Sequence, residues 1–92
     1  MFRGSLKNRS GVTSSVANQW SQVAPENPSR MYLLIQNISD TPITVGVGQP
    51  TAEFAFVELS SNGIYSASGF VTTQRLVVKS TGTSKAYFAC EA

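Results

Sequence analysis

Apolar and polar residues alternate along most of the chain after residue 30, and turn-forming residues recur about every eight to twelve positions. In the segment 43–48, Ile43, Val45 and Val47 alternate with Thr and Gly, which places three branched side chains on one face of a strand. Asn62-Gly63 is the dipeptide typical of tight turns with positive backbone angles. This rhythm predicts an all-β domain, either an antiparallel sandwich or a small barrel.

The alternation predicts strands over 31–35, 43–48, 54–59, 74–79 and 86–90, with a short strand over 20–24. The first two are expected to form a hairpin, because the segment 37–42 is rich in turn residues. The Ser/Gly-rich stretch after Tyr65 is expected to be a short connection. In the strand 74–79, Leu76 and Val78 are expected to point inward, and Arg75, Val77 and Lys79 outward.

The size of the chain allows one thin core. It has 92 residues, 41% of them hydrophobic and 13% charged, so we expect a single domain with an unusually uncharged surface. A ligand site in so small a domain would be shallow or shared with another chain. Oligomerisation is one of the few ways left to stabilise it, because the composition offers no disulfide within the chain.

Candidate chemistry is sparse. The chain has no His and one Cys, Cys90, which removes the commonest general base and every Cys/His metal cluster. Glu53 and Glu58 stand at odd spacing on one expected strand and would point to opposite faces. Gly46-Val47-Gly48 has no helix after it to bind a phosphate. We therefore expect no enzyme, with no catalytic, cofactor-binding or metal-binding residue and no cofactor.

The N-terminal segment carries the excess positive charge. Residues 1–24 contain three basic residues and no acidic one, whereas residues 25–92 contain four basic and five acidic residues. We expect a basic, partly extended arm over 1–24 and a β-sandwich body over 25–92. The spacing of Val12, Val16, Trp20 and Val23 also suits one face of a helix, but the many Ser, Thr and Asn residues favour the extended arm. Three basic residues neutralise too few phosphates for specific nucleic-acid binding.

Targeting signals are not visible in the sequence. No apolar run of about 7 to 15 residues follows the N-terminus, as a signal peptide would require. No stretch approaches the ~18 apolar residues of a membrane span. We expect synthesis in a cytoplasm, no membrane contact, and a reduced Cys90 that serves as a small strand residue.

Two runs of residues carry a family resemblance. Residues 27–40, NPSRMYLLIQNISD, are followed by ITVGVG at 43–48. The arrangement resembles small virion proteins of tailed bacteriophages, in which an arginine opens a strand that ends in an Ile-Gln-Asn-x-Ser turn and a second strand closes on glycine. The similarity extends over about residues 20–92, through Asn62-Gly63 and the last strand. It implies a compact β-sandwich or jelly-roll-like subunit, most often a decoration or cement protein of the capsid.

The resemblance implies a non-enzymatic protein on the capsid surface of the virion, made in the cytoplasm of the bacterial host. Its partner would be the major capsid protein, and it would form a homo-oligomer, with a trimer favoured. The arm would clamp neighbouring shell subunits, and deletion of residues 1–20 is expected to abolish this binding and to leave the body folded. Arg30 would either open its strand or pair with Asp40. The expected partner-binding residues are Phe2, Arg3, Leu6, Lys7, Arg9, Val12 and Trp20.

Two other functions stay open at this stage. A component of the tail or of the head-to-tail junction would share the same composition but occur in fewer copies per particle. A glycan-binding attachment module would use an exposed aromatic ring, with Trp20 or Tyr65 as the stacking surface.

Overall fold

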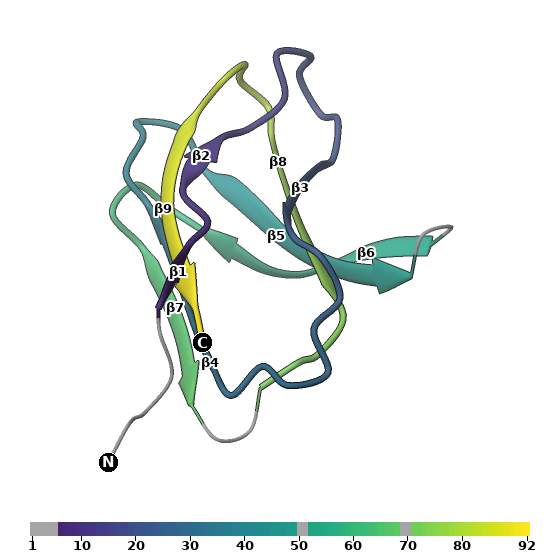
Figure 1. Ribbon diagram of the computed structural model, residues 1–92. Helices are drawn as coiled ribbons and strands as arrows, with labels where there is room; N and C mark the ends of the chain where they lie inside the picture. Colours follow the sequence, from purple (N-terminus) through teal and green to yellow (C-terminus); the bar gives the residue numbers. More distant parts are fainter. Residues whose placement is uncertain (1–5, 50–51, 69–70) are drawn as a thin grey trace.

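The computed structural model describes residues 6–49, 52–68 and 71–92, and these residues form β-strands and turns without a helix. One antiparallel sheet has five strands in the order β1-β9-β4-β7, with β2 also paired to β9. Its strands are β1 (Lys7–Asn8), β2 (Gly11–Val12), β4 (Tyr32–Asn37), β7 (Ile64–Ser68) and β9 (Ala86–Glu91). In Figure 1 this sheet lies on the left of the view.

The second antiparallel sheet has four strands in the order β3-β8-β5-β6. Its strands are β3 (Ser21–Ala24), β5 (Ile43–Gln49), β6 (Ala52–Leu59) and β8 (Arg75–Ser80). The two sheets face each other as a sandwich (Figure 1). The expectation of a small antiparallel β-sandwich is confirmed.

The strand pairing is nested. β1 and β2 pair with β9, β3 with β8, β4 with β7, and β5 with β6. The chain therefore follows one long hairpin that is folded over so that successive paired segments fall in alternate sheets. With β1 and β2 counted as one interrupted strand, these are eight strands in two four-position sheets, which is the jelly-roll arrangement.

The core lies between the sheets and follows the period-two pattern. In β4, Leu33, Ile35 and Asn37 are buried while the residues between them are half-buried. Many of the buried side chains are branched, and β-branched side chains suit strands because they pack well on the pleated surface. The fully buried apolar side chains of the core cluster are Ala24, Leu33, Ile35, Ile43, Val45, Leu76, Val78 and Ala89.

Two polar residues fix the crossings between the sheets. Asn62 has a positive φ of 67° and stands with Gly63 in the turn from β6 to β7, as the sequence predicted. The buried Asn37 amide donates hydrogen bonds to the carbonyl oxygens of Thr41, at 2.8 Å, and Leu59, at 2.9 Å. One side chain thus holds together the turn after β4 and the end of β6.

Two local expectations were wrong. β4 and β5 do not form a hairpin, because they lie in different sheets and the turn between them crosses the sandwich. Because the chain crosses from one sheet to the other here, the apolar residues of β4 and of β5 face the same core from opposite sides. The stretch after Tyr65 continues as strand β7 to Ser68. Val77 points away from the core cluster, as expected, but it is nevertheless buried.

The described part of the N-terminal segment is extended, as expected, and not helical, and the short strand expected over 20–24 is present as β3. The segment is, however, paired with the strands of the body. β1 and β2 extend the first sheet beside β9, and β3 extends the second beside β8. Thr13 is buried, and its hydroxyl accepts a hydrogen bond from the Lys85 backbone N–H at 2.9 Å. Strands within residues 7–24 therefore extend both sheets.

Candidate functional site

The face of the five-stranded sheet that points away from the core carries no charged side chain among the described residues. Its composition follows from the strand register: Gln36 lies between Ile64 and Phe88, and Leu34 lies between Ser66 and Cys90. We call this surface the outer face, and its residues are Asn8, Val12, Tyr32, Leu34, Gln36, Ile64, Ser66, Ser68, Ala86, Phe88 and Cys90.

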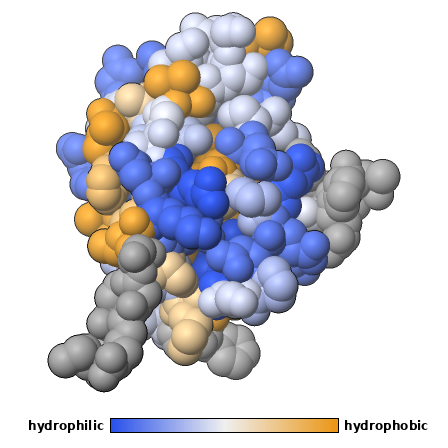
Figure 2. Space-filling model, viewed as in Figure 1, coloured by the Kyte–Doolittle hydropathy of each residue, from blue (hydrophilic) through white to orange (hydrophobic). Residues whose placement is uncertain are grey.

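Large apolar side chains on the outer face are open to solvent. Val12, Ile64 and Phe88 are 53%, 57% and 42% exposed, and Leu6, just before β1, is 58% exposed. Figure 2 shows hydrophobic residues gathered on the side of the molecule where the five-stranded sheet lies. A sheet face that stays in water is normally polar, and a contiguous apolar surface marks a site of association. The outer face is the candidate functional site.

The structure places the expected partner-binding residues at different sites. Leu6 and Lys7 are exposed at the start of β1, and Val12 lies on the outer face. Trp20 is half-buried and precedes β3 in the other sheet. Phe2 and Arg3 lie outside the described residues. Sequence reasoning missed Ile64 and Phe88, although their alternation with Tyr65 and Tyr87 would have indicated outward-facing apolar positions.

Arg9 is held by a carboxylate of the same chain. Its Nε donates to Oε2 of Glu91 at 2.7 Å. The other oxygen of Glu91 accepts from Nε of Arg30 at 2.9 Å and from Nδ2 of Asn27 at 3.1 Å. We call these four residues the Glu91 cluster. The positive charge of Arg9 is therefore used inside the domain rather than offered to an acidic partner.

The Arg30–Glu91 pair is completely removed from water. Both side chains have no exposed surface, at 0% each. The remaining Arg30 nitrogens donate to the carbonyl oxygens of Pro25, Thr72 and Gln74, at 2.9 to 3.0 Å. A buried ion pair is tolerated only when its other polar atoms are bonded in this way. The cluster thus ties the last strand to the loops that precede β4 and β8.

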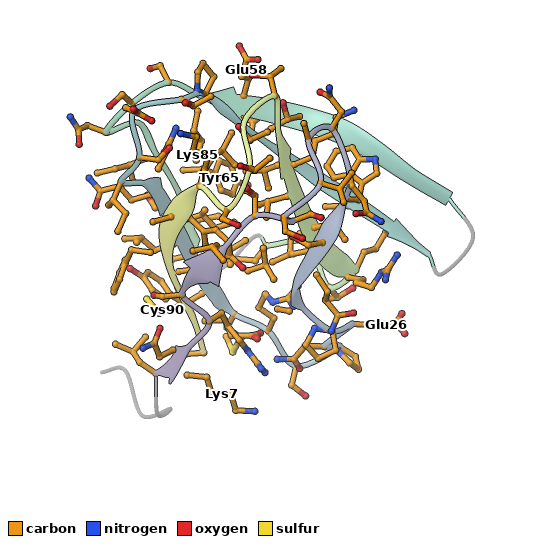
Figure 3. All side chains as sticks on the ribbon, turned by 90° about the horizontal axis from the view of Figure 1, so that it is seen from above. Lys7, Glu26, Glu58, Tyr65, Lys85 and Cys90 are labelled. Atoms are coloured by element: carbon orange, nitrogen blue, oxygen red, sulfur yellow. The ribbon has the colours of Figure 1, made fainter. Side chains whose placement is uncertain are left out.

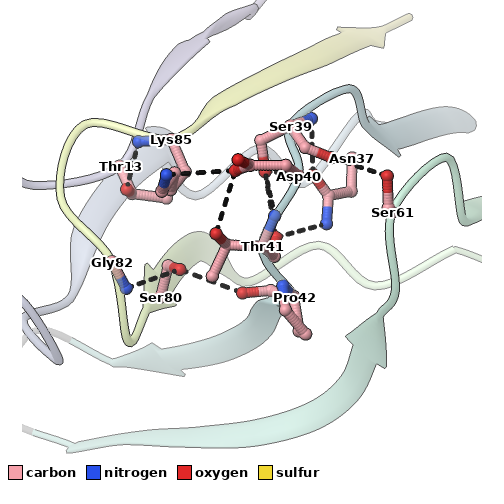
Figure 4. Close-up of polar contacts among 10 residues, drawn as sticks. All are labelled: Thr13, Asn37, Ser39, Asp40, Thr41, Pro42, Ser61, Ser80, Gly82 and Lys85. Carbon is pink, nitrogen blue, oxygen red and sulfur yellow. Dashed lines mark hydrogen bonds and ion pairs between the residues drawn. The ribbon is translucent and has the colours of Figure 1, made fainter.

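Of the two roles considered for Arg30, the pairing with Asp40 is not found, because Arg30 pairs with Glu91. Asp40 instead accepts a hydrogen bond from Nζ of Lys85 at 3.0 Å, and its side chain is 85% exposed (Figure 4). Glu91 shares the inward face of β9 with Tyr87 and Ala89, so its period-two position was a signal that an acidic side chain would be buried. The sequence did not indicate which basic side chain would pair with the Glu91 carboxylate.

The two acidic side chains titrate under different influences. Burial raises the pKa of the Glu91 carboxyl, but hydrogen bonds from Arg30, Asn27 and Arg9 outweigh burial, and the pKa lies below its ordinary value of 4.5. The pKa of Asp40 is lowered from 3.8 by the hydrogen bond from Lys85, with a smaller contribution from Thr41. Both carboxyls are therefore ionised at neutral pH.

The two aromatic rings considered for glycan stacking are both engaged. Nζ of Lys79 lies 4.7 Å from the centre of the Trp20 ring, at cation–π distance. Tyr65 is half-buried and packs against the core, and Figure 3 shows it between the sheets. A sugar would have to displace Lys79 before it could stack on this face of Trp20.

Groups for catalysis or metal binding do not converge in the described part of the chain. No group of three or more Cys, Asp or Glu side chains is placed to hold a metal ion there. Glu26, Glu58 and Lys7 lie far apart (Figure 3). Cys90 is a free thiol, half-buried on the outer face.

No family model, curated protein or solved structure matches this chain. Among the described residues there is no helix of the length and apolar character needed to cross a membrane.

Proposed function

We propose that the protein is a non-enzymatic structural protein of a virion, a decoration or cement protein on the capsid of a tailed bacteriophage. The observation that carries the proposal is an uncharged sheet face with solvent-exposed apolar side chains, Val12, Ile64 and Phe88, on a jelly roll. Jelly rolls build many viral capsid domains, although the fold alone does not decide function, because lectins and cupins share it. The resemblance of residues 20–92 to small virion proteins supports the viral choice.

In this proposal the outer face packs on neighbouring subunits of the major capsid protein. Val12, Phe88 and Leu6 supply apolar contacts. Lys7 is exposed but pairs with Glu91 in the register, so it lies on the side of β1 opposite the outer face. Repetition of the contact over a symmetric shell lets many weak interfaces add up, so one interface need not be large. The protein acts as a small oligomer on the capsid surface.

The first test is the composition of purified particles. A decoration protein is expected in a copy number that approaches that of the major shell protein, measured from band intensities on a denaturing gel. A few tens of copies would instead assign the protein to the tail or to the head-to-tail junction. Absence from purified particles would overturn the virion proposal.

The second test is binding to empty shells. Replacement of both Val12 and Phe88 by Ser is expected to weaken binding at least about tenfold, because exposed apolar residues at the centre of an interface carry most of its free energy. Val16→Ser is the matched control, since Val16 is 59% exposed and lies on the loop between β2 and β3. Equal binding by the double variant and the control would exclude the outer face as the docking surface.

A further inference from the structure

Within the described part of the chain, β7 is an edge strand, and one side of its backbone has no strand beside it. It pairs with β4 on one side, and no other described strand lies on its free side. The hydrogen bond from the Asn37 N–H to the Gly63 carbonyl, at 2.9 Å, fixes the phase of the β4–β7 ladder. Hydrogen-bonded and non-hydrogen-bonded pairs alternate in such a ladder, so Tyr65 and Ala67 turn their backbone groups toward β4. Ile64, Ser66 and Ser68 therefore turn their N–H and C=O groups outward.

The ladder on the other side of β4 supports the same phase. Tyr32 and Ala92 exchange two hydrogen bonds of 3.0 Å, so the even-numbered residues of β4 bond toward β9. Its odd-numbered residues, such as Leu33 and Ile35, then bond toward Ala67 and Tyr65. The three outward-facing backbone positions of β7 thus follow from two independent sets of contacts.

The other sheet edges carry features that oppose self-pairing. β1 and β2 have two residues each and flank Arg9. β3 has an irregular register and is followed by Pro25 and Glu26. β6 contains Glu53 and Glu58. Charge, proline, irregularity and short length are the usual means by which proteins prevent edge-to-edge association.

β7 has none of these features. Its five residues, Ile-Tyr-Ser-Ala-Ser, are uncharged and contain no proline, and its pairing with β4 is regular. When a strand pairs antiparallel with a second copy of itself, the side chains of one copy lie opposite side chains of the same sequence in the other copy. A charged strand therefore places like charges near each other, which is destabilising. The β7 sequence places no charge opposite another.

We propose that two copies of the protein pair through β7 about a two-fold axis, with Ser66 opposite Ser66 of the second copy. This register uses all three outward-facing positions, since Ile64 of each copy then lies opposite Ser68 of the other. The two five-stranded sheets join into one, and their outer faces become continuous. An interface of this kind uses the same patch on both copies and closes at two subunits, so it predicts a dimer in place of the trimer that the family resemblance implies.

The first experiment measures self-association of the purified full chain by analytical ultracentrifugation. The chain is expected to dimerise, and Ser66→Lys is expected to weaken dimerisation at least about tenfold, because it places two ammonium groups opposite each other. Ser66→Thr, which keeps the strand uncharged, is the matched control and is expected to dimerise like the wild type. Thermal unfolding of both variants checks the fold. Because Ser66 is exposed, neither substitution is expected to unfold the domain.

The second experiment locates the axis. In a Cys90→Ser background, Ser66→Cys is expected to form a disulfide-linked dimer on mild oxidation, because hydrogen-bonded antiparallel residues lie about 5.5 Å apart between Cα atoms. Ser15→Cys, exposed on the loop between β2 and β3, is the control and is expected to remain uncrosslinked at the same concentration.

Three results would overturn the inference: a monomer at about millimolar concentration, an oligomer that Ser66→Lys leaves unchanged, or a trimer. The inference does not rest on the proposed function, since both experiments use the isolated chain. A dimer absent from phage particles would refute the virion proposal alone, and a monomeric decoration protein would refute the β7 pairing alone.

Discussion

Three side chains converge on the carboxylate of Glu91, which is fully buried. Removal of one member of a buried ion pair leaves the other charge without compensation, at a cost of about 3–5 kcal/mol. Glu91→Ala is therefore expected to lower the free energy of unfolding by about that amount in urea titrations. Asp40→Ala is the control and should change it little, because the Asp40 carboxylate is exposed to solvent. Similar losses for the two variants would contradict the importance of the cluster.

The same carboxylate predicts how stability depends on pH. The folded-state pKa of Glu91 lies below 4.5, so the ionised group is favoured by folding. Its contribution is fully present above pH 4.5, and it is lost as the pH falls through the folded-state pKa, because the unfolded chain takes up a proton first. The free energy of unfolding is expected to decrease in this acidic range, with a smaller slope in Glu91→Gln. An unchanged slope in that variant would assign the acid sensitivity to other groups.

At the scale of elements, the turn between β6 and β7 sets how the chain crosses from one sheet to the other. A Cβ atom added to Gly63 would lie 2.9 Å from the backbone oxygen of Ser60, a contact that only a backbone shift can relieve. Gly63→Ala is expected to destabilise the fold by about 1–3 kcal/mol. At Gly82 the added atom would meet only the flexible side chain of Lys85, so Gly82→Ala is the control with a small effect. Thermal unfolding compares the two variants. Equal melting temperatures for Gly63→Ala and Gly82→Ala would show that the turn does not require glycine at position 63.

At the scale of the whole molecule, the N-terminal segment is part of the sandwich. Removal of residues 1–12 would delete β1, β2, the Arg9–Glu91 bond and the 2.7 Å hydrogen bond from the Arg9 N–H to Ala89. At about 1 kcal/mol for each of several hydrogen bonds, the truncated chain should lose at least about 3 kcal/mol of stability. Urea unfolding measures this loss, and an unchanged midpoint would restore the model of a separate arm.

The place of the N-terminal segment in the sandwich changes how the proposed capsid binding should be tested. Deletion of residues 1–20 was expected to leave a folded body, but that segment supplies two strands and buries Thr13. A loss of binding after such a deletion would not separate a missing contact from a damaged fold. Single substitutions at exposed positions such as Val12 keep these effects apart.

The sequence by itself determined six of the strands, β3, β4, β5, β6, β8 and β9, and several inward positions, because period-two alternation is local and burial follows from it. It did not indicate β1, β2 or β7. Ile43, Val45, Leu76 and Val78 were placed in the core on that basis, and each is fully buried. The Asn62-Gly63 turn was also predictable, since its backbone angles depend on two neighbouring residues.

Only the tertiary structure decided which strands are neighbours and which charges meet. The turn residues after β4 suit a hairpin and a crossing equally well, and the choice depends on β7 and β9, which are distant in sequence. Arg30 and Glu91 are separated by 61 positions, and their pairing exists only because β9 lies beside β4. Local chemistry sets where a side chain points, but the register between distant strands sets what it meets there.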